Sequence, residues 1–222
     1  MRLAILASLN GTNAQAIVEA VRTGTLDAEV AVIVTNRTDA GVIARGRNLG
    51  IPVVVVPSKG VGDREVYDSM VLEVLKRYEV DTVALAGWMR ILSDRFINAY
   101  PGRVLNLHPA LLPSFPGGTG IADAYGYGVK VAGCTVHLVS STLDGGPIVI
   151  QAAVPVRGTE EELEELIHRM EHLIFPQALQ WLSEGRISMK GRCTAIMPSA
   201  RPVTEVGIVD GCLVNPPLEI RR

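Results

Sequence analysis

Apolar residues in the first half of the chain form short runs, separated by segments with helical spacing. The runs are rich in β-branched and aliphatic residues and predict buried strands at residues 3–7, 28–35, 52–56, 82–86 and 104–107. Between the first two runs, apolar side chains recur every three or four positions, at Ala14, Ile17, Val18 and Val21. The same spacing follows Asp63, a residue type suited to cap a helix, and it predicts a buried face of Val66, Met70, Val71, Val74 and Leu75. This alternation predicts an α/β fold, with an open, mostly parallel, twisted sheet and helices on both of its faces.

The pattern changes after Gly117. Residues 131–140 and 147–156 predict two longer strands joined through a turn at Asp144-Gly145-Gly146, and therefore an antiparallel hairpin. Beyond about residue 185 the sequence predicts short strands and turns. We expect one main domain over residues 1–185, with a C-terminal extension over residues 186–222 packed on the same domain.

A long helix is predicted between the hairpin and the extension. Thr159 and Glu162 have the spacing of a capping box, which opens a helix. Its apolar face is predicted to carry Leu163, Leu166, Ile167, Met170 and Ile174. Pro176 is expected to kink or end the helix, because proline lacks the N–H that a helix interior needs.

Composition narrows the classes of partner. The chain has 222 residues and a net charge of −2 without blocks of like charge, which argues against nucleic acid as a ligand and favours small molecules. Its three cysteines are widely spaced and fit neither a disulfide framework nor a CxxC metal site, as expected for a cytoplasmic protein. No segment has the length and apolarity of a signal sequence or membrane span. Monomer and homodimer both remain open.

Two regions carry polar residues where strands are predicted to end. Gly11, Thr12 and Asn13 follow the first strand and open a helix, a place where free N–H groups can hold a phosphate. An ordinary capped helix start is the commoner explanation of such a junction, and the segment is not a GxGxxG dinucleotide motif. Farther along, Asn106 and His108 would point the same way from an extended strand and could meet one reacting centre.

His137, within an apolar strand run, is a candidate comparable with His108. Other candidates have a plain structural explanation: Asp144 before two glycines is a common turn composition. His168 and His172 are explained by a solvated helix face. Glu171 is unusual because it is aligned with the apolar stripe of the long helix, where a carboxylate can meet a cationic ligand.

Taken in order, these segments resemble the folate-dependent formyltransferases, and among them the phosphoribosylglycinamide formyltransferase family with its Rossmann-like fold. The matching segments are Asn10–Asn13, Asp63–Glu65, Ala86–Leu92, Asn106–Pro113, Leu143–Pro147 and Glu171–His172. The chain departs from the family pattern at Leu9, where glycine is usual, and at Thr119, near which a histidine is common. Trp88 stands in place of a phenylalanine or tyrosine.

The resemblance implies roles for matching residues. Asn106 would be an oxyanion donor, His108 the general acid and base, and Asp144 the group that orients the imidazole and favours its protonated form. Gly11, Thr12, Asn13 and Glu171 would bind the ribonucleotide substrate. The folate, 10-formyltetrahydrofolate as formyl donor, would be contacted by Arg64, Met89, Arg90, Ile91, Leu92, Asn106, Ser140, Ser141, Thr142, Leu143 and Asp144.

The implied reaction is transfer of the formyl group to the amine of phosphoribosylglycinamide in purine biosynthesis, without a metal. Two other activities stay open on the sequence. One is a formyltetrahydrofolate deformylase, which would use the same three groups with water as acceptor. The other is a non-catalytic module that binds a phosphorylated metabolite.

Overall fold

The computed structural model describes residues 1–221, and it divides into two compact units, Met1–Asn106 and the chain from Leu107 onward. No helix in the described part of the chain is both long and apolar enough to cross a membrane.

The first unit is built on a parallel sheet of five strands in the order β5-β4-β1-β2-β3. The strands are β1 (Arg2–Leu6), β2 (Glu29–Thr35), β3 (Val53–Val55), β4 (Thr82–Leu85) and β5 (Val104–His108), whose last two residues belong to the second unit. The five runs identified in the sequence are therefore strands, with ends that differ by one or two residues. Most of their side chains are buried, as expected for a parallel sheet covered on both faces.

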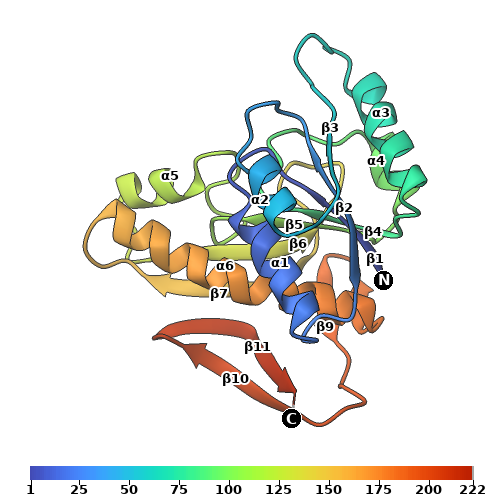
Figure 1. Ribbon diagram of the computed structural model, residues 1–222. Helices are drawn as coiled ribbons and strands as arrows, with labels where there is room; N and C mark the ends of the chain where they lie inside the picture. Colours follow the sequence, from blue (N-terminus) through green and yellow to red (C-terminus); the bar gives the residue numbers. More distant parts are fainter. Residues whose placement is uncertain (222) are drawn as a thin grey trace. The chain divides into compact units, whose positions relative to one another are not determined.

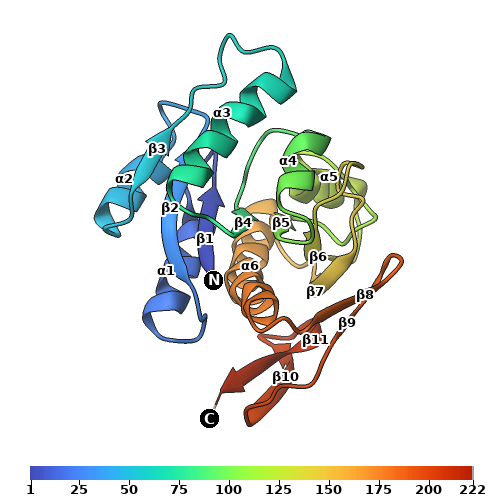
Figure 2. The same cartoon turned by 90° about the vertical axis from the view of Figure 1, so that its right-hand side faces the viewer.

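Four helices connect these strands: α1 (Thr12–Arg22), α2 (Val42–Asn48), α3 (Arg64–Arg77) and α4 (Asp94–Ala99). The chain runs outward from β1 to β3 and then returns to β4, on the other side of β1. Since parallel crossovers are right-handed, this reversal places α1 and α2 on one face and α3 and α4 on the other. In Figure 2, β1 and β2 lie between α3 on one side and the pair of α1 and α2 on the other. The predicted α/β class with helices on both faces is confirmed.

The start of α3 agrees with the sequence, but its buried face differs. The Asp63 carboxylate accepts hydrogen bonds from the N–H groups of Glu65 and Val66, so the predicted N-cap is confirmed. The predicted burial of Val66 and Met70 was wrong, because these side chains are 55% and 43% exposed. The helix instead buries Tyr67, Asp68, Val71 and Leu75. It is rotated toward a face that includes a carboxylate, which an apolar pattern does not indicate.

The second unit contains an antiparallel sheet in the order β10-β11-β7-β6. The strands are β6 (Val131–Leu138), β7 (Ile148–Pro155), β10 (Val203–Val209) and β11 (Cys212–Arg221). A short helix, α5 (Gly120–Tyr127), precedes β6, and the long helix α6 (Glu160–Ser183) packs on β6 and β7 (Figure 1). The predicted hairpin of β6 and β7 is confirmed.

Helix α6 begins as predicted but ends later. Thr159 and Glu162 form the reciprocal hydrogen bonds of a capping box. Of the two outcomes expected at Pro176, a kink or an end, the helix does not end there, since α6 continues to Ser183 with Pro176 inside it. Residues on either side of the proline, including Phe175 and Ala178, are fully buried. Their packing stabilises the helical backbone beyond the lost hydrogen bond.

The sequence predicted strands and turns after α6, and the structure has strands there, paired as two hairpins (Figure 2). Strands β8 (Ile187–Lys190) and β9 (Cys193–Ile196) form a separate two-stranded sheet, and β11 pairs with β7 through Leu213–Asn215. Arg186, at the start of this segment, bonds to both carboxylate oxygens of Glu219 on β11, at 2.6 Å each.

Candidate active site

The loop between β1 and α1 has a backbone that requires glycine. Gly11 is the N-cap of α1 and has φ of 75°, in the left-handed region. A Cβ at this position would lie 2.4 Å from Cγ2 of Val42, so a larger residue would clash as well as strain the backbone. Thr12 and Asn13 form the first turn of α1, where N–H groups are available to an anion. The three residues predicted to bind phosphate therefore lie together at this helix start.

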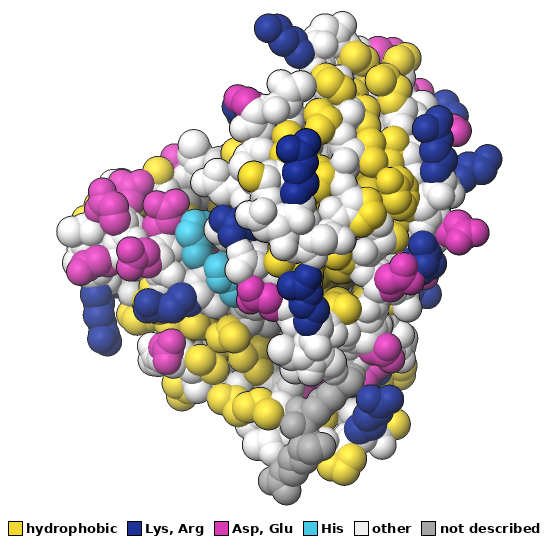
Figure 3. Space-filling view, viewed as in Figure 1, with side chains coloured by type: hydrophobic (Ala, Val, Ile, Leu, Met, Phe, Trp, Pro, Cys, Tyr) yellow, Lys and Arg dark blue, Asp and Glu magenta, His cyan; other side chains and the backbone are white. Residues whose placement is uncertain are grey.

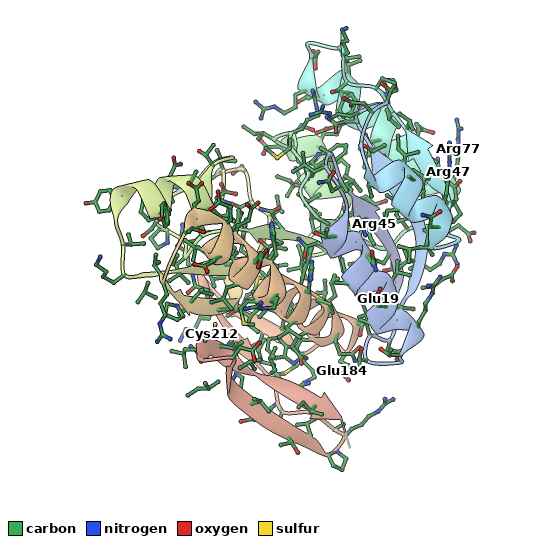
Figure 4. The ribbon with its side chains drawn as sticks, turned by 60° about the vertical axis from the view of Figure 1, so that its left-hand side comes forward. Glu19, Arg45, Arg47, Arg77, Glu184 and Cys212 are labelled. Atoms are coloured by element: carbon green, nitrogen blue, oxygen red, sulfur yellow. The ribbon has the colours of Figure 1, made fainter. Side chains whose placement is uncertain are left out.

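Helix α2 holds the same loop from the side. The N–H of Val42 donates to the carbonyl oxygen of Leu9 at 3.0 Å, and Nε of Arg45 donates to the carbonyl oxygen of Asn10 at 2.8 Å. Arg45 also bonds to the side chain of Gln15 on α1, and Figure 4 shows Arg45 on α2 beside that helix. Among residues 1–221, positive φ outside glycine occurs at Glu79, Phe115, Asp144 and Asp210. Leu9 therefore replaces the usual glycine without needing this conformation.

The segment after β4 contains the predicted folate contacts of the first unit. The N–H of Met89 donates to Oγ of Ser8 at 2.9 Å, which ties the segment to the end of β1. The Arg90 guanidinium carbon lies 4.1 Å from the ring centroid of Tyr67. Trp88 stacks on the same ring, with centroids 6.4 Å apart, so this departure from the family pattern is accommodated by packing. Burial raises the pKa of Tyr67, which therefore stays neutral beneath the guanidinium.

The predicted folate residues differ in exposure. Met89 and Ile91 are about half exposed, Arg64 is exposed at the first position of α3, and Leu92 is buried. In the second unit Ser141, Thr142 and Leu143 are exposed and Ser140 is half-buried, with its hydroxyl donating to the carbonyl oxygen of Thr142 at 3.3 Å.

Strand β5 carries both Asn106 and His108. Asn106 is half-buried and is the last residue of the first unit. His108 is 3% exposed, and its Nε2 lies 2.8 Å from the carbonyl oxygen of Phe115. Because a carbonyl oxygen can only accept, Nε2 carries a hydrogen in this arrangement. The opposite ring nitrogen, Nδ1, lies 3.6 Å from Oδ2 of Asp144.

Asp144 stands at the centre of the polar groups in the second unit. It has φ of 46°, and its Oδ2 accepts a hydrogen bond from the N–H of Gly117 at 2.9 Å. The side chain is only 8% exposed. The turn that carries it requires glycine at 146, where a Cβ would lie 1.7 Å from the carbonyl oxygen of Leu138. The aspartate of this glycine turn is thus held against His108.

His137 is a further member of this group, which the sequence did not place among the catalytic residues. Its Nε2 lies 3.8 Å from Oδ1 of Asp144, and its Nδ1 donates to the carbonyl oxygen of Leu138 at 3.0 Å. Burial lowers the pKa of His137, although the bond to Leu138 and the charge of Asp144 oppose this shift. The imidazole of His137 is therefore neutral at pH 7 beside the carboxylate. A histidine inside an apolar strand was the only signal for it.

Two positions singled out in the sequence remain: Glu171, a predicted binding residue, and Thr119, a departure from the family pattern. Glu171 is 3% exposed on α6, and its Oε2 lies 2.8 Å from Nδ1 of His168, so His168 is more than a residue of a solvated face. Thr119 is the N-cap of α5, and its hydroxyl donates to the carboxylate of Asp123 at 2.7 Å. It has a structural role in place of the histidine usual in the family.

The pairing of His108 with Asp144 supplies a proton donor and acceptor in a mostly buried setting, which suits group transfer between small molecules. The fold and these groups define an α/β enzyme of the group-transfer class. The chain belongs to the formyl transferase family, whose model matches residues 1–179. The resemblance read from the sequence is confirmed at this level.

Similar proteins agree with this assignment. Phosphoribosylglycinamide formyltransferase of Escherichia coli K12 is 38% identical over 85% of this chain and 90% of its own length. The trifunctional purine biosynthetic protein adenosine-3 of Gallus gallus is 39% identical over 85% of the chain, but the chain spans only 19% of that protein. The crystal structure of glycinamide ribonucleotide transformylase 1 from Symbiobacterium toebii is 42% identical and has a TM-score of 0.86, covering 89% of this chain and 94% of that one.

Proposed function

We propose that the protein transfers the formyl group of 10-formyltetrahydrofolate to the amine of phosphoribosylglycinamide, a step of de novo purine biosynthesis. The observation that carries the proposal is the pair of His108 and Asp144 at 3.6 Å, within a chain that covers nine tenths of a bacterial relative bearing this activity in its name. Both substrates are small molecules, and the cytoplasm is the expected compartment.

The chemistry assigns one task to each catalytic group. The neutral amine of the substrate attacks the formyl carbon, and negative charge develops on the formyl oxygen. The amide of Asn106 donates a hydrogen bond to that oxygen, and the imidazolium of His108 donates a second one when its Nε2–H turns from the carbonyl oxygen of Phe115 to the substrate. As the carbon–nitrogen bond to N10 of the folate breaks, one proton leaves the attacking nitrogen and one reaches N10. His108 moves these protons directly or through water, with Asp144 orienting its ring.

Binding is assigned to the remaining predicted residues. The start of α1 at Gly11, Thr12 and Asn13 would hold the phosphate, because its N–H groups and the helix dipole favour an anion. Glu171 would accept a hydrogen bond from the substrate amine. Arg64, the segment Met89–Leu92 and the loop Ser140–Asp144 would contact the folate. We also propose one main domain over residues 1–185, with residues 186–222 as an extension; the match of the family model to residues 1–179 supports this division.

The test is turnover of 10-formyltetrahydrofolate followed by absorbance, with and without phosphoribosylglycinamide, for the wild type and for His108→Ala. We expect turnover that requires the ribonucleotide and falls by roughly 10²–10³-fold in the variant. Thermal unfolding of the variant checks that it is folded. Equal turnover without the ribonucleotide would identify a deformylase instead. Folate binding without any turnover would leave only a binding module.

A further inference from the structure

His168 lies between two carboxylates on successive turns of α6. Its Nδ1 is 2.8 Å from Oε2 of Glu171, and its Nε2 is 3.4 Å from Oε1 of Glu164. A neutral imidazole has only one N–H, so only the imidazolium donates toward both carboxylates at once. The pKa of His168 is raised above its ordinary value, chiefly by the hydrogen bond to Glu171 and further by the charge of both glutamates.

The two glutamates differ in their surroundings. The side chain of Glu164 is 55% exposed, whereas that of Glu171 is 4% exposed. An exposed carboxylate is well solvated, but a buried one needs a cation or strong hydrogen bonds. His168 is itself 40% exposed and supplies this partner from the surface side. Figure 3 shows histidine side chains at the surface close to acidic ones.

Other titratable groups near the pair come from the elements packed against α6. From β6, Cys134 faces Glu171, and burial together with the charge of Glu171 raises the pKa of its thiol, which stays neutral. On α6, the imidazole of His168 lies 2.8 Å from the carboxylate of Glu171 and can carry a compensating charge.

We propose that His168 is a positioning residue for substrate binding: as an imidazolium it compensates the charge of buried Glu171 and fixes the carboxylate that accepts the substrate amine. This inference rests on the proposed function, because it needs Glu171 to meet that amine. The reacting atoms are served by His108 and Asp144, so His168 acts on binding of the ribonucleotide and leaves the chemical step alone.

The pH dependence has a definite sign. The charged form of His168 is present below its raised pKa and is lost as the pH rises through it. In His168→Asn, the side-chain amide still donates a hydrogen bond toward Glu171 but carries no charge. At each pH, kcat/KM for phosphoribosylglycinamide is measured for both proteins, and the wild-type value is divided by that of the variant. Groups that titrate in both proteins then cancel from the ratio. We expect a ratio of about tenfold near pH 6, carried by KM, that falls toward one near pH 9.

Arg169→Gln is the matched control, since it removes one positive charge from the neighbouring, exposed position of α6. We expect its KM to stay within about twofold of the wild type at each pH. A wild-type-to-variant ratio for His168→Asn that does not change with pH, or a loss carried by kcat, would overturn the positioning role.

A second measurement is independent of activity. Imidazole signals of the protein, followed by NMR during a pH titration and assigned through His168→Asn, should give a raised pKa for His168 that falls in Glu171→Gln. If His168 has an ordinary pKa in an enzyme that is active, the inference about His168 is overturned and the proposed function stands. Absence of ribonucleotide-dependent transfer in the wild type overturns the proposed function, and the role of His168 with it.

Discussion

His108 and Asp144 face each other across 3.6 Å, from Nδ1 to Oδ2, while the other ring nitrogen of His108 donates to the carbonyl oxygen of Phe115. The distance is too long for a direct hydrogen bond, so the interaction is electrostatic or passes through water. With a hydrogen on Nε2, a neutral ring would point a lone pair at the carboxylate. The imidazolium would point an N–H at it. Asp144 therefore orients the ring of His108, and only an imidazolium presents an N–H on both of its ring nitrogens.

Replacing Asp144 with asparagine should lower kcat by roughly 10²-fold, because the amide does not stabilise the charge that the imidazole of His108 gains during proton transfer. Steady-state kinetics checks this expectation. Asp123→Asn is the matched control, since Asp123 is exposed and its carboxylate bonds to Thr119. Equal effects of the two substitutions would contradict the role of Asp144.

His137 should make the stability of the protein depend on pH. Burial lowers its pKa in the folded state, so the unfolded chain binds more protons at acidic pH. The stability contributed by the neutral ring is present above the unfolded pKa of about 6.5 and is lost as the pH falls. Urea unfolding between about pH 7 and pH 5 should show a smaller loss in His137→Asn than in the wild type. His168, whose pKa is raised, contributes with the opposite sign in both proteins. Parallel curves for the two proteins would disprove the assignment.

Gly11→Ala should weaken binding of the ribonucleotide, because the new Cβ would meet Val42 at 2.4 Å and displace the start of α1. We expect KM for this substrate to rise roughly tenfold or more. Gly24→Ala is the control: Gly24 has φ of 74°, but a Cβ at this position would have no neighbouring atom within 4 Å. It should cost only about 1 kcal/mol of backbone strain and leave KM unchanged. A similar KM for both variants would mean that the contact with Val42 does not matter.

The sequence predicted the elements well where local chemistry decides them. Strand runs, the Asp63 cap and the capping box at Thr159 depend on neighbouring residues, and each was confirmed. Two differences came from tertiary packing. Val66 and Met70 have the right spacing for a buried face, but spacing does not say which face a sheet will cover. Proline tends to end a helix, but at Pro176 the packing of the buried residues around it outweighs this tendency.

The sequence predicted which residues belong to the candidate site, but not how their side chains are arranged in space. Asn106, His108 and Asp144 follow from their motifs, but the approach of His137 to Asp144 appears only in the folded chain, next to a register shift between Val136 and His137 in the pairing of β6 with β7. No hydrophobic pattern encodes that shift. The ion pair of His168 and Glu171 has a spacing of three on one helix, which is common on surfaces. Only the burial of Glu171 distinguishes it, and burial comes from the fold.

Arg186 should be the residue that attaches the C-terminal segment most strongly. Its guanidinium is 8% exposed, and it donates to both oxygens of Glu219 and to the carbonyl oxygen of Met197. Arg186→Met leaves the mostly buried carboxylate of Glu219 without its partner, which should cost about 3 kcal/mol of unfolding free energy in urea. The double variant Arg186→Met with Glu219→Leu should regain part of this loss, since both charges are then removed. Arg192→Met, at an exposed position, should change stability by less than about 0.5 kcal/mol. An equally small effect of Arg186→Met would show that the β10–β11 hairpin is held by its pairing with β7 and its bond to Gln177 of α6, without the ion pair.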